Sequence, residues 1–137
     1  MSEKRLVHIC RLPIRWGDMD AMGHVNNAVY FRYIEQARIE WFVSMGVATV
    51  HAVDGPVVIN ANCTFLRQLT FPGDLEIRTF SGAIGRSSFE TMQEIRRIDD
   101  PDTLIAEGGA KVVWVNAGTG KSMALPNALR ERLATAM

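Results

Sequence analysis

One stretch of this chain has the periodicity of a long helix, and almost everything around it has the pattern of strands. Between Ala28 and Met45, apolar residues recur at the three-and-four spacing of one helical face: Tyr30, Tyr33, Ile34, Ala37, Trp41 and Met45. Four later segments are rich in β-branched and aromatic residues: Val57–Leu69, Leu75–Ile84, Ser87–Ile98 and Leu104–Val115. A chain of this kind has to pack its helix against a sheet.

The connections between the strand segments are short and rich in Gly, Pro and Asp: Phe71-Pro72-Gly73-Asp74, Gly85-Arg86 and Asp99-Asp100-Pro101-Asp102. Short connections make neighbouring strands antiparallel, because a parallel crossover needs a dozen or more residues. With one strand before the helix, the sequence predicts an α+β fold of order β-α-β-β-β-β, a five-stranded antiparallel sheet wrapped around one long helix. We expect a single domain over residues 1–137, since a chain of this length buries one core. A short helix is expected after Pro126.

The segment before the helix has the alternation of a strand buried on one face. Apolar residues stand at every second position between Val7 and Trp16: Cys10, Leu12, Ile14 and Trp16. Pro13 marks an edge or a bend in this strand. Asn26 or Asn27 is the expected helix N-cap, and Gly46 is the expected end. Long edge strands are a pairing hazard, so we expect a partner subunit to cover them.

Composition excludes several classes of function. Fifteen Lys and Arg balance fifteen Asp and Glu, so no overall field draws the chain to nucleic acid or to an anionic membrane. No apolar run approaches the roughly 18 to 20 residues of a spanning helix. Cys10 and Cys63 have neither the density of a disulfide scaffold nor the spacing of a zinc site. Because the N-terminus lacks a signal-peptide pattern, we expect a cytoplasmic protein that binds neither nucleic acid nor membrane.

The segment Trp16–Asn27, just before the helix, is rich in Asp, Gly, His and Asn. An aspartate pair followed by a glycine suggests a calcium loop, but Met22 and Val29 stand where the fifth and twelfth positions need oxygen ligands. His24 has no second histidine or cysteine at zinc-ligand spacing, so we expect no metal site here. Gly118-Thr119-Gly120-Lys121-Ser122 lacks the first glycine of a phosphate loop and is expected to be a hairpin turn.

The same segment can be interpreted in two ways. It could be a capped turn, in which Asp and Asn side chains accept backbone hydrogen bonds. It could also be a reactive site, since a carboxylate just before a helix can reach a substrate carbonyl held at the helix N-terminus, where first-turn amides lack intrahelical acceptors. Asp20 would supply the carboxylate, and the amides near Asn27 would form the oxyanion site.

The run from Asp18 to Tyr30, Asp-Met-Asp-Ala-Met-Gly-His-Val-Asn-Asn-Ala-Val-Tyr, followed by Glu35, resembles the motif of the hotdog-fold acyl-coenzyme A thioesterases of the 4-hydroxybenzoyl-coenzyme A thioesterase type. The resemblance extends from the first strand to about Val115. It implies a hotdog fold, with Asp20 as the catalytic carboxylate and the backbone amide of Asn27 as the oxyanion donor. It also implies a homodimer whose sheets join edge to edge, with the pocket between one helix and its neighbour; a homotetramer is the alternative assembly.

Further site residues are expected around this motif. Gly23 should shape the oxyanion site together with the first helical turn, and Tyr30 and Tyr33 should line or back the acyl pocket. His24 is either an orienting residue of the pocket or a structural, hydrogen-bonded one. Met22 stands where plant acyl-carrier-protein thioesterases have an asparagine, so their catalytic network does not transfer whole.

Binding of the coenzyme A portion needs cations. Arg86 matches a position where relatives place basic residues that contact coenzyme A phosphates, although it could equally be an exposed hairpin arginine. Arg67 and Lys111 are less specific candidates for the same task. Glu35 is expected to be a buried salt-bridge or helix-packing partner rather than an acid or base.

The sequence therefore predicts hydrolysis of an acyl-coenzyme A thioester to free acid and coenzyme A, without a metal or redox cofactor. Asp20 would act as a nucleophile, through a mixed anhydride, or as a general base for water. The alternative in another class is a non-catalytic acyl-coenzyme A binding or sensing module on the same fold. A hydratase is disfavoured because Ala28–Met45 contains no histidine.

Overall fold

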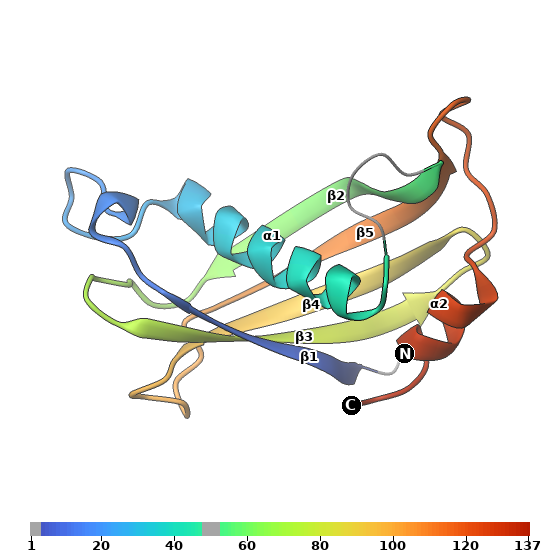
Figure 1. Cartoon of the computed structure of the whole chain (residues 1–137). Coiled ribbons are helices and arrows are strands. Elements are labelled where there is room, and N and C mark those ends of the chain that lie inside the picture. The colour runs from blue at the N-terminus through green and yellow to red at the C-terminus, as the bar shows by residue number, and fades with distance from the viewer. Residues whose placement is uncertain (1–3, 48–52) are drawn as a thin grey trace.

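The computed structural model describes residues 4–47 and 53–137 and has the hotdog fold. Its strands are β1 (Arg5–Pro13), β2 (Asp54–Phe65), β3 (Asp74–Ile84), β4 (Ser88–Arg97) and β5 (Ala106–Asn116). The helix α1 (Asn27–Ser44) lies across one face of the sheet, which curves around it, and the short helix α2 (Asn127–Leu133) lies at one end (Figure 1). The predicted order of elements is confirmed, including the short helix after Pro126.

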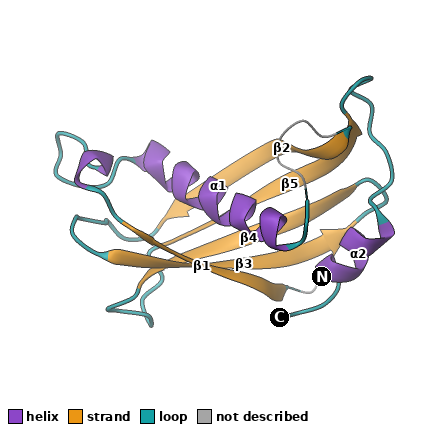
Figure 2. Ribbon diagram, in the orientation of Figure 1, coloured by secondary structure: helices purple, strands orange, loops and turns teal. Residues whose placement is uncertain are grey.

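The five strands form an antiparallel sheet of order β1-β3-β4-β5-β2 (Figure 2). The central strands β3, β4 and β5 follow one another as antiparallel neighbours, as their connections predicted. The hairpin expected at Phe71-Pro72-Gly73-Asp74 is wrong, because β2 pairs with β5 and not with β3. The strands that flank the helix in sequence, β1 and β2, occupy the two edges. The helix therefore carries the chain from one edge of the sheet to the other.

Both ends of α1 are set by local chemistry. The Asn26 side-chain oxygen accepts the Ala28 N–H at 2.9 Å, which is an N-cap. Gly46 follows the helix with φ of 77°, in the left-handed region that glycine adopts without strain. No helix within the described ranges combines the length and hydropathy that a membrane span requires.

The core between α1 and the sheet consists of two apolar clusters. The first surrounds the N-terminal half of α1 and includes Tyr30, Tyr33, Ile34, Ala37, Cys10, Leu75, Ile77 and Ile95. The second surrounds its C-terminal half and is closed by α2: Trp41, Phe42, Phe89, Val112, Trp114, Leu125, Leu129 and Leu133. The predicted apolar helix face is buried as expected up to Trp41, while Met45 lies at the C-cap. Arg38 and Phe42 are buried on the same helix although the prediction omitted them.

Two predicted strand ends are wrong because hydrogen bonds outside the sheet redirect the chain. β1 ends at Pro13, and Trp16 is 74% exposed instead of buried, since Trp16–Asp18 forms a 3-10 turn. β2 ends at Phe65 rather than Leu69. The Leu69 carbonyl instead accepts the Val25 N–H at 2.9 Å, and so ties this segment to the loop that precedes α1.

Cys10 is buried in the first cluster, and its thiol donates a hydrogen bond to Glu40 Oε2 at 2.8 Å. Burial, together with the hydrogen bond and charge of Glu40, raises the pKa of the thiol to about 12. In the unfolded chain the thiol loses its proton nearer its ordinary pKa of 9.0. Between these values the unfolded state binds fewer protons than the folded state, so the free energy of unfolding falls as pH rises.

We therefore expect the free energy of unfolding to decrease from about pH 9 to about pH 12, by at most ~1.4 kcal/mol per pH unit from this group. Cys10→Ser retains a donor to Glu40 but does not titrate in this range. Urea unfolding across the interval should show a shallower decrease for Cys10→Ser than for the parent. Identical slopes would contradict the assignment to Cys10.

Candidate active site

The loop between the 3-10 turn and α1 is a tight, hydrogen-bonded turn. The Asp20 N–H donates to the His24 carbonyl and the Gly23 N–H donates to the Asp20 carbonyl, both at 3.0 Å. Met19 and Val25 pair as an isolated bridge at its base. Gly23 has φ of 81°, which a residue with a side chain rarely adopts. Gly23 therefore forms the turn that returns the chain to the start of α1.

The Asp20 carboxylate is exposed, yet both of its oxygens are held. Oδ1 accepts the Met22 N–H at 2.9 Å, and Oδ2 accepts a hydrogen from the Asn26 side-chain nitrogen at 3.2 Å. The Asn26 side-chain oxygen is the N-cap of α1, so one amide group connects the carboxylate to the helix start. The sequence analysis treated Asn26 only as a cap. The signal was available, because a capping asparagine keeps a free NH₂ group for a second partner.

Asp18, the other member of the aspartate pair, is buried, and its carboxylate accepts hydrogen bonds from two residues. Its Oδ2 accepts the Tyr33 hydroxyl at 2.6 Å and the Arg15 N–H at 2.9 Å. Burial and the hydrogen bond to Asp18 both raise the pKa of the Tyr33 hydroxyl. Asp18 thus fixes the loop to α1, and it differs from Asp20 in being enclosed. The structure does not bring Tyr33 to the cavity beside Asp20.

A cavity of about 420 Å³ lies beside the Asp20 carboxylate. It is formed by the loop, the first turn of α1 and the segment that follows β2: Asp20, Met22, His24, Val25, Asn27, Tyr30, Phe65, Leu66, Arg67 and Gln68. The structure therefore brings Asp20, His24, Asn27 and Tyr30 together, with Arg67 as the nearby cation. Gly23 is not among the residues that line the cavity.

The wall of this cavity opposite the loop comes from the end of β2. The rings of Tyr30 and Phe65 meet edge to face, with centroids 4.9 Å apart. The Tyr30 hydroxyl donates to the Arg67 carbonyl over 3.5 Å, and burial raises its pKa. Sequence reasoning missed Phe65, Leu66 and Gln68, because it placed them within the second strand. No sequence pattern indicates that this segment returns to the start of α1.

The helix start supplies donors for a developing negative charge. Asn26 satisfies the Ala28 amide through its side chain and the Val29 amide through its carbonyl. Asn27, the first helical residue, lines the cavity and has an amide for which the helix provides no acceptor. This arrangement favours attack on a carbonyl carbon. The carboxylate can act on the carbon, while the free first-turn amide and the positive end of the helix dipole stabilise the negative charge that develops on the oxygen.

Arg86 lies far from this cavity within one subunit. It stands in the β3–β4 turn, and its carbonyl accepts hydrogen bonds from the Leu125 N–H and the Arg130 side chain. β3 begins at Asp74 near the Asp20 end of the sheet, and its 11 residues extend about 35 Å to the other end (Figure 1). Glu35 forms an ion pair with Arg32 at 3.1 Å, but its side chain is 53% exposed, so the prediction of a buried salt bridge at this position is wrong.

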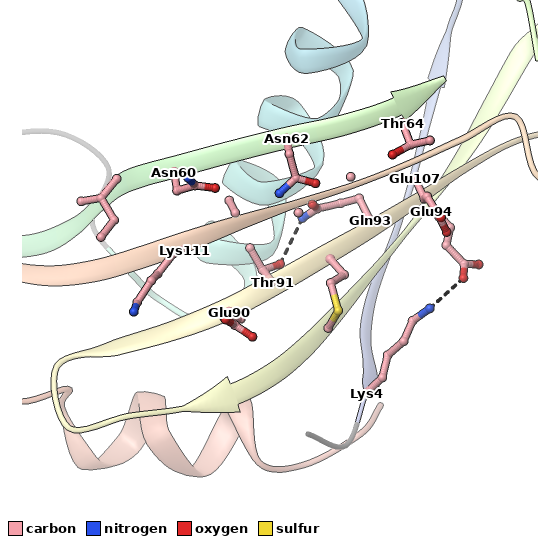
Figure 3. A pocket seen from close by; sticks show the side chains of 15 residues that line it. Lys4, Asn60, Asn62, Thr64, Glu90, Thr91, Gln93, Glu94, Glu107 and Lys111 are labelled. Atoms are coloured by element: carbon pink, nitrogen blue, oxygen red, sulfur yellow. Dashed lines mark hydrogen bonds and ion pairs between the residues drawn. The ribbon is translucent and has the colours of Figure 1, made fainter. Parts of the chain in front are cut away.

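Lys111 lies on the face of the sheet opposite α1, in a separate cavity of about 740 Å³ (Figure 3). Polar side chains of β2, β4 and β5 line it, among them Asn60, Asn62 and Glu90. At its margin the Lys4 amine pairs with Glu94 at 2.9 Å. Because the sheet separates the two cavities, Lys111 is not part of the site around Asp20.

Within residues 4–47 and 53–137 no three His, Cys, Asp or Glu side chains are placed to hold a metal ion.

Comparison with known proteins identifies the family. The family model described as the thioesterase-like superfamily matches residues 14–133. The long-chain acyl-CoA thioesterase FadM of Escherichia coli (strain K12) is 27% identical over 127 residues, which cover 90% of this chain and 94% of FadM.

Two solved structures are similar in both sequence and fold. The PA2801 protein of Pseudomonas aeruginosa, provisionally named a thioesterase, is 36% identical with a TM-score of 0.90, covering 93% of this chain and 98% of that one. A Xanthomonas campestris protein, provisionally named an acyl-CoA thioesterase, is 37% identical with a TM-score of 0.76, covering 86% and 100%. This chain belongs to the thioesterase-like superfamily and is a thioester hydrolase.

Proposed function

We propose that the protein hydrolyses an acyl-coenzyme A thioester in the cavity beside Asp20. The observation that carries the proposal is the Asp20 carboxylate, held by Met22 and Asn26 next to the amide of the first residue of α1. FadM is named a long-chain acyl-CoA thioesterase and the similar Xanthomonas campestris protein is provisionally named an acyl-CoA thioesterase, and these names support coenzyme A as the thiol of the substrate.

In the proposed reaction, the Asn27 amide donates a hydrogen bond to the thioester carbonyl oxygen. As a nucleophile, an Asp20 oxygen would bond to the carbonyl carbon while the carbon–sulfur bond breaks; coenzyme A leaves as a thiolate, and water then hydrolyses the mixed anhydride. As a general base, Asp20 would take a proton from water as that water attacks the same carbon. Both routes release the acid and coenzyme A and regenerate the carboxylate.

The remaining wall residues would shape the pocket around this reaction. Tyr30 and Phe65 provide an aromatic surface suited to an acyl group. His24 is half-buried on the same cavity, where we propose that its ring contacts and orients the bound thioester. Arg67 stands at the cavity with its side chain exposed, so it can reach anionic parts of coenzyme A.

The test is to incubate the purified protein with a panel of acyl-coenzyme A esters while following both free thiol and a ligand-binding signal. The proposal predicts thiol release well above the uncatalysed rate for at least one ester. Binding without thiol release across the panel and across acid to mildly alkaline pH would favour a sensing module instead.

We further propose that the protein is a homodimer joined through β2. This edge strand has four large apolar side chains that are more than a third exposed in a single subunit: Val57, Val58, Ile59 and Phe65. Light scattering at micromolar concentration should therefore give twice the 15.3 kDa of one chain, or four times if dimers associate further. A particle of one chain's mass would contradict the dimer.

Such a dimer would give Arg86 a role that it cannot have within one subunit. If two β2 edges pair antiparallel, the partner's β3–β4 turn comes to the end of the joined sheet that holds the Asp20 cavity. We then expect Arg86→Ala to raise the KM for full acyl-coenzyme A more than the KM for the matching acyl-pantetheine, because charge-assisted contacts to phosphate are lost. Steady-state kinetics with both substrates measures this ratio. An unchanged ratio would leave Arg86 as an exposed hairpin arginine.

A further inference from the structure

A short segment between β2 and β3 contacts both ends of the loop that precedes α1. The Leu69 carbonyl accepts the Val25 N–H at 2.9 Å, and the Gly73 carbonyl accepts the Ile14 N–H at 2.8 Å. We name the residues from Leu69 to Gly73 the strap, and those from Ile14 to Val25 the reactive loop, which includes Asp20. Both lie at the same end of the sheet (Figure 1). The strap therefore holds the reactive loop at its two ends.

The strap itself is positioned mainly by hydrogen bonds. Leu69 is buried in the core, but Thr70, Phe71 and Pro72 are exposed. A segment with few buried apolar contacts opens easily unless polar contacts hold it. The Thr70 carbonyl accepts a hydrogen from Arg97 Nη1 at 3.2 Å, and the Pro72 carbonyl accepts one from Arg97 Nη2 at 2.9 Å. Arg97, the last residue of β4, thus connects the strap to the sheet.

The Arg97 guanidinium is itself held in one orientation. Its Nε and Nη2 donate to the two carboxylate oxygens of Asp99 at 2.9 and 3.2 Å. Such a two-point contact fixes the plane of the guanidinium, whose remaining N–H groups then face the strap. The group also lies against Gly73, where an added Cβ would collide with Nη1, Nη2 and Cζ of Arg97. Glycine at this position therefore leaves room for the guanidinium.

The wall of the Asp20 cavity is held by a different contact. The Leu66 and Arg67 N–H groups both donate to the Ile105 carbonyl, at 3.0 and 2.9 Å. The carbonyls that Arg97 binds come after this wall in the chain. Loss of the Arg97 side chain would therefore loosen the reactive loop more than the wall.

Val25 connects the strap to Asp20. It lies between His24, whose carbonyl accepts the Asp20 N–H at 3.0 Å, and Asn26, whose side chain donates to the Asp20 carboxylate at 3.2 Å. A shift of Val25 would therefore move both groups that hold Asp20. Because catalysis depends on the exact placement of the reactive group, a small displacement would lower the rate.

We propose that Arg97 is a positioning residue for thioester hydrolysis: its guanidinium holds the strap, and the strap keeps Asp20 in place beside the Asn27 amide. The inference rests on the reaction proposed above at Asp20. It adds a residue that is not among those lining the Asp20 cavity.

Kinetic constants test the proposal because they separate positioning from binding. Arg97→Met keeps most of the side-chain stem and removes every donor. We expect kcat to fall on the order of 10-fold while KM changes by less than about threefold, because Asp20 shifts and the wall stays in place. Arg97→Lys keeps the charge but not the planar fork, so it should show a smaller loss of the same kind.

Hydrogen exchange, followed residue by residue by NMR, gives a second readout that needs no substrate. In Arg97→Met the protection of the Ile14 and Val25 amides should fall on the order of 10-fold, whereas the Leu66 and Arg67 amides should keep theirs. If the parent hydrolyses no acyl-coenzyme A, the proposed function fails, while the exchange rates still report whether Arg97 holds the strap.

Arg96→Met is the matched control. Arg96 is the preceding residue of β4, its side chain is similarly enclosed at 16% exposed, and it donates to Glu94 and to the Pro101 carbonyl instead of the strap. We expect this variant to keep the parental kcat and the parental exchange at Val25, even if its melting temperature falls. Parental kcat or parental Val25 exchange in Arg97→Met, a rise in KM alone, or an equal loss of kcat in Arg96→Met would overturn the inference.

Discussion

Replacing Asp20 with asparagine is expected to lower kcat for acyl-coenzyme A hydrolysis by at least about 100-fold. Asparagine has nearly the same shape and keeps an oxygen to accept the Met22 N–H, but it cannot attack a carbonyl or take a proton. Thiol release measures the loss, while the melting temperature and the affinity for acyl-coenzyme A report the fold and the pocket. Both of these should remain close to the parental values, because Asp20 is exposed.

Asp18→Asn is the matched control, because it makes the same chemical change two residues earlier. Asp18 is buried with Tyr33 and Arg15 as partners, so we expect a loss of about 1–3 kcal/mol in the free energy of unfolding. The effect on kcat should be far smaller than that at Asp20. Equal losses of kcat at both positions would refute the assignment of the chemistry to Asp20.

The second large effect is expected at Asn26, which positions Asp20. Asn26→Asp keeps an oxygen to cap α1 but replaces the donor that is 3.2 Å from Asp20 with a second carboxylate. We expect a loss of kcat on the order of 10- to 100-fold, with a smaller change in KM, because the nearby charge displaces the reactive group. Steady-state kinetics gives the two constants separately.

Asn26→Ser distinguishes positioning from helix capping. Serine is also a good N-cap, so the helix and the melting temperature should be retained, but it has no NH₂ group to hold Asp20. We expect kcat to fall by roughly 10-fold with helical content unchanged. Full kcat in this variant would show that the contact between Asn26 and Asp20 has no role in the reaction.

Periodicity and residue type together carried the fold prediction. The three-and-four spacing from Tyr30 to Trp41 reflects burial of one helix face against the core, whereas β-branched and aromatic residues between short connections indicated β3, β4 and β5. The strand ends depended instead on contacts between distant segments. Trp16 and Leu69 continue the apolar pattern of their strands, yet hydrogen bonds formed only in the folded chain redirect both segments.

The reactive part of the site was predictable because it is local in sequence. Asp20, His24 and Asn27 lie within one loop and one helical turn, so their proximity follows from the motif. The opposite wall, at Phe65 and Arg67, is separated from this loop in sequence by α1 and β2. No local pattern indicates that the chain after β2 returns to the start of α1. Periodicity likewise marks Tyr33 as buried without revealing that its hydroxyl binds Asp18.

The most direct test of the site is a crystal structure of Asp20→Asn with a bound acyl-coenzyme A. The substitution should preserve the complex, because it removes the reactive group and leaves the cavity intact. The account predicts the thioester carbonyl oxygen within hydrogen-bond distance of the Asn27 amide, with the carbonyl carbon beside residue 20 and the acyl group against Tyr30. A thioester bound elsewhere, such as in the outer cavity lined by Asn60, Asn62 and Lys111, would contradict it.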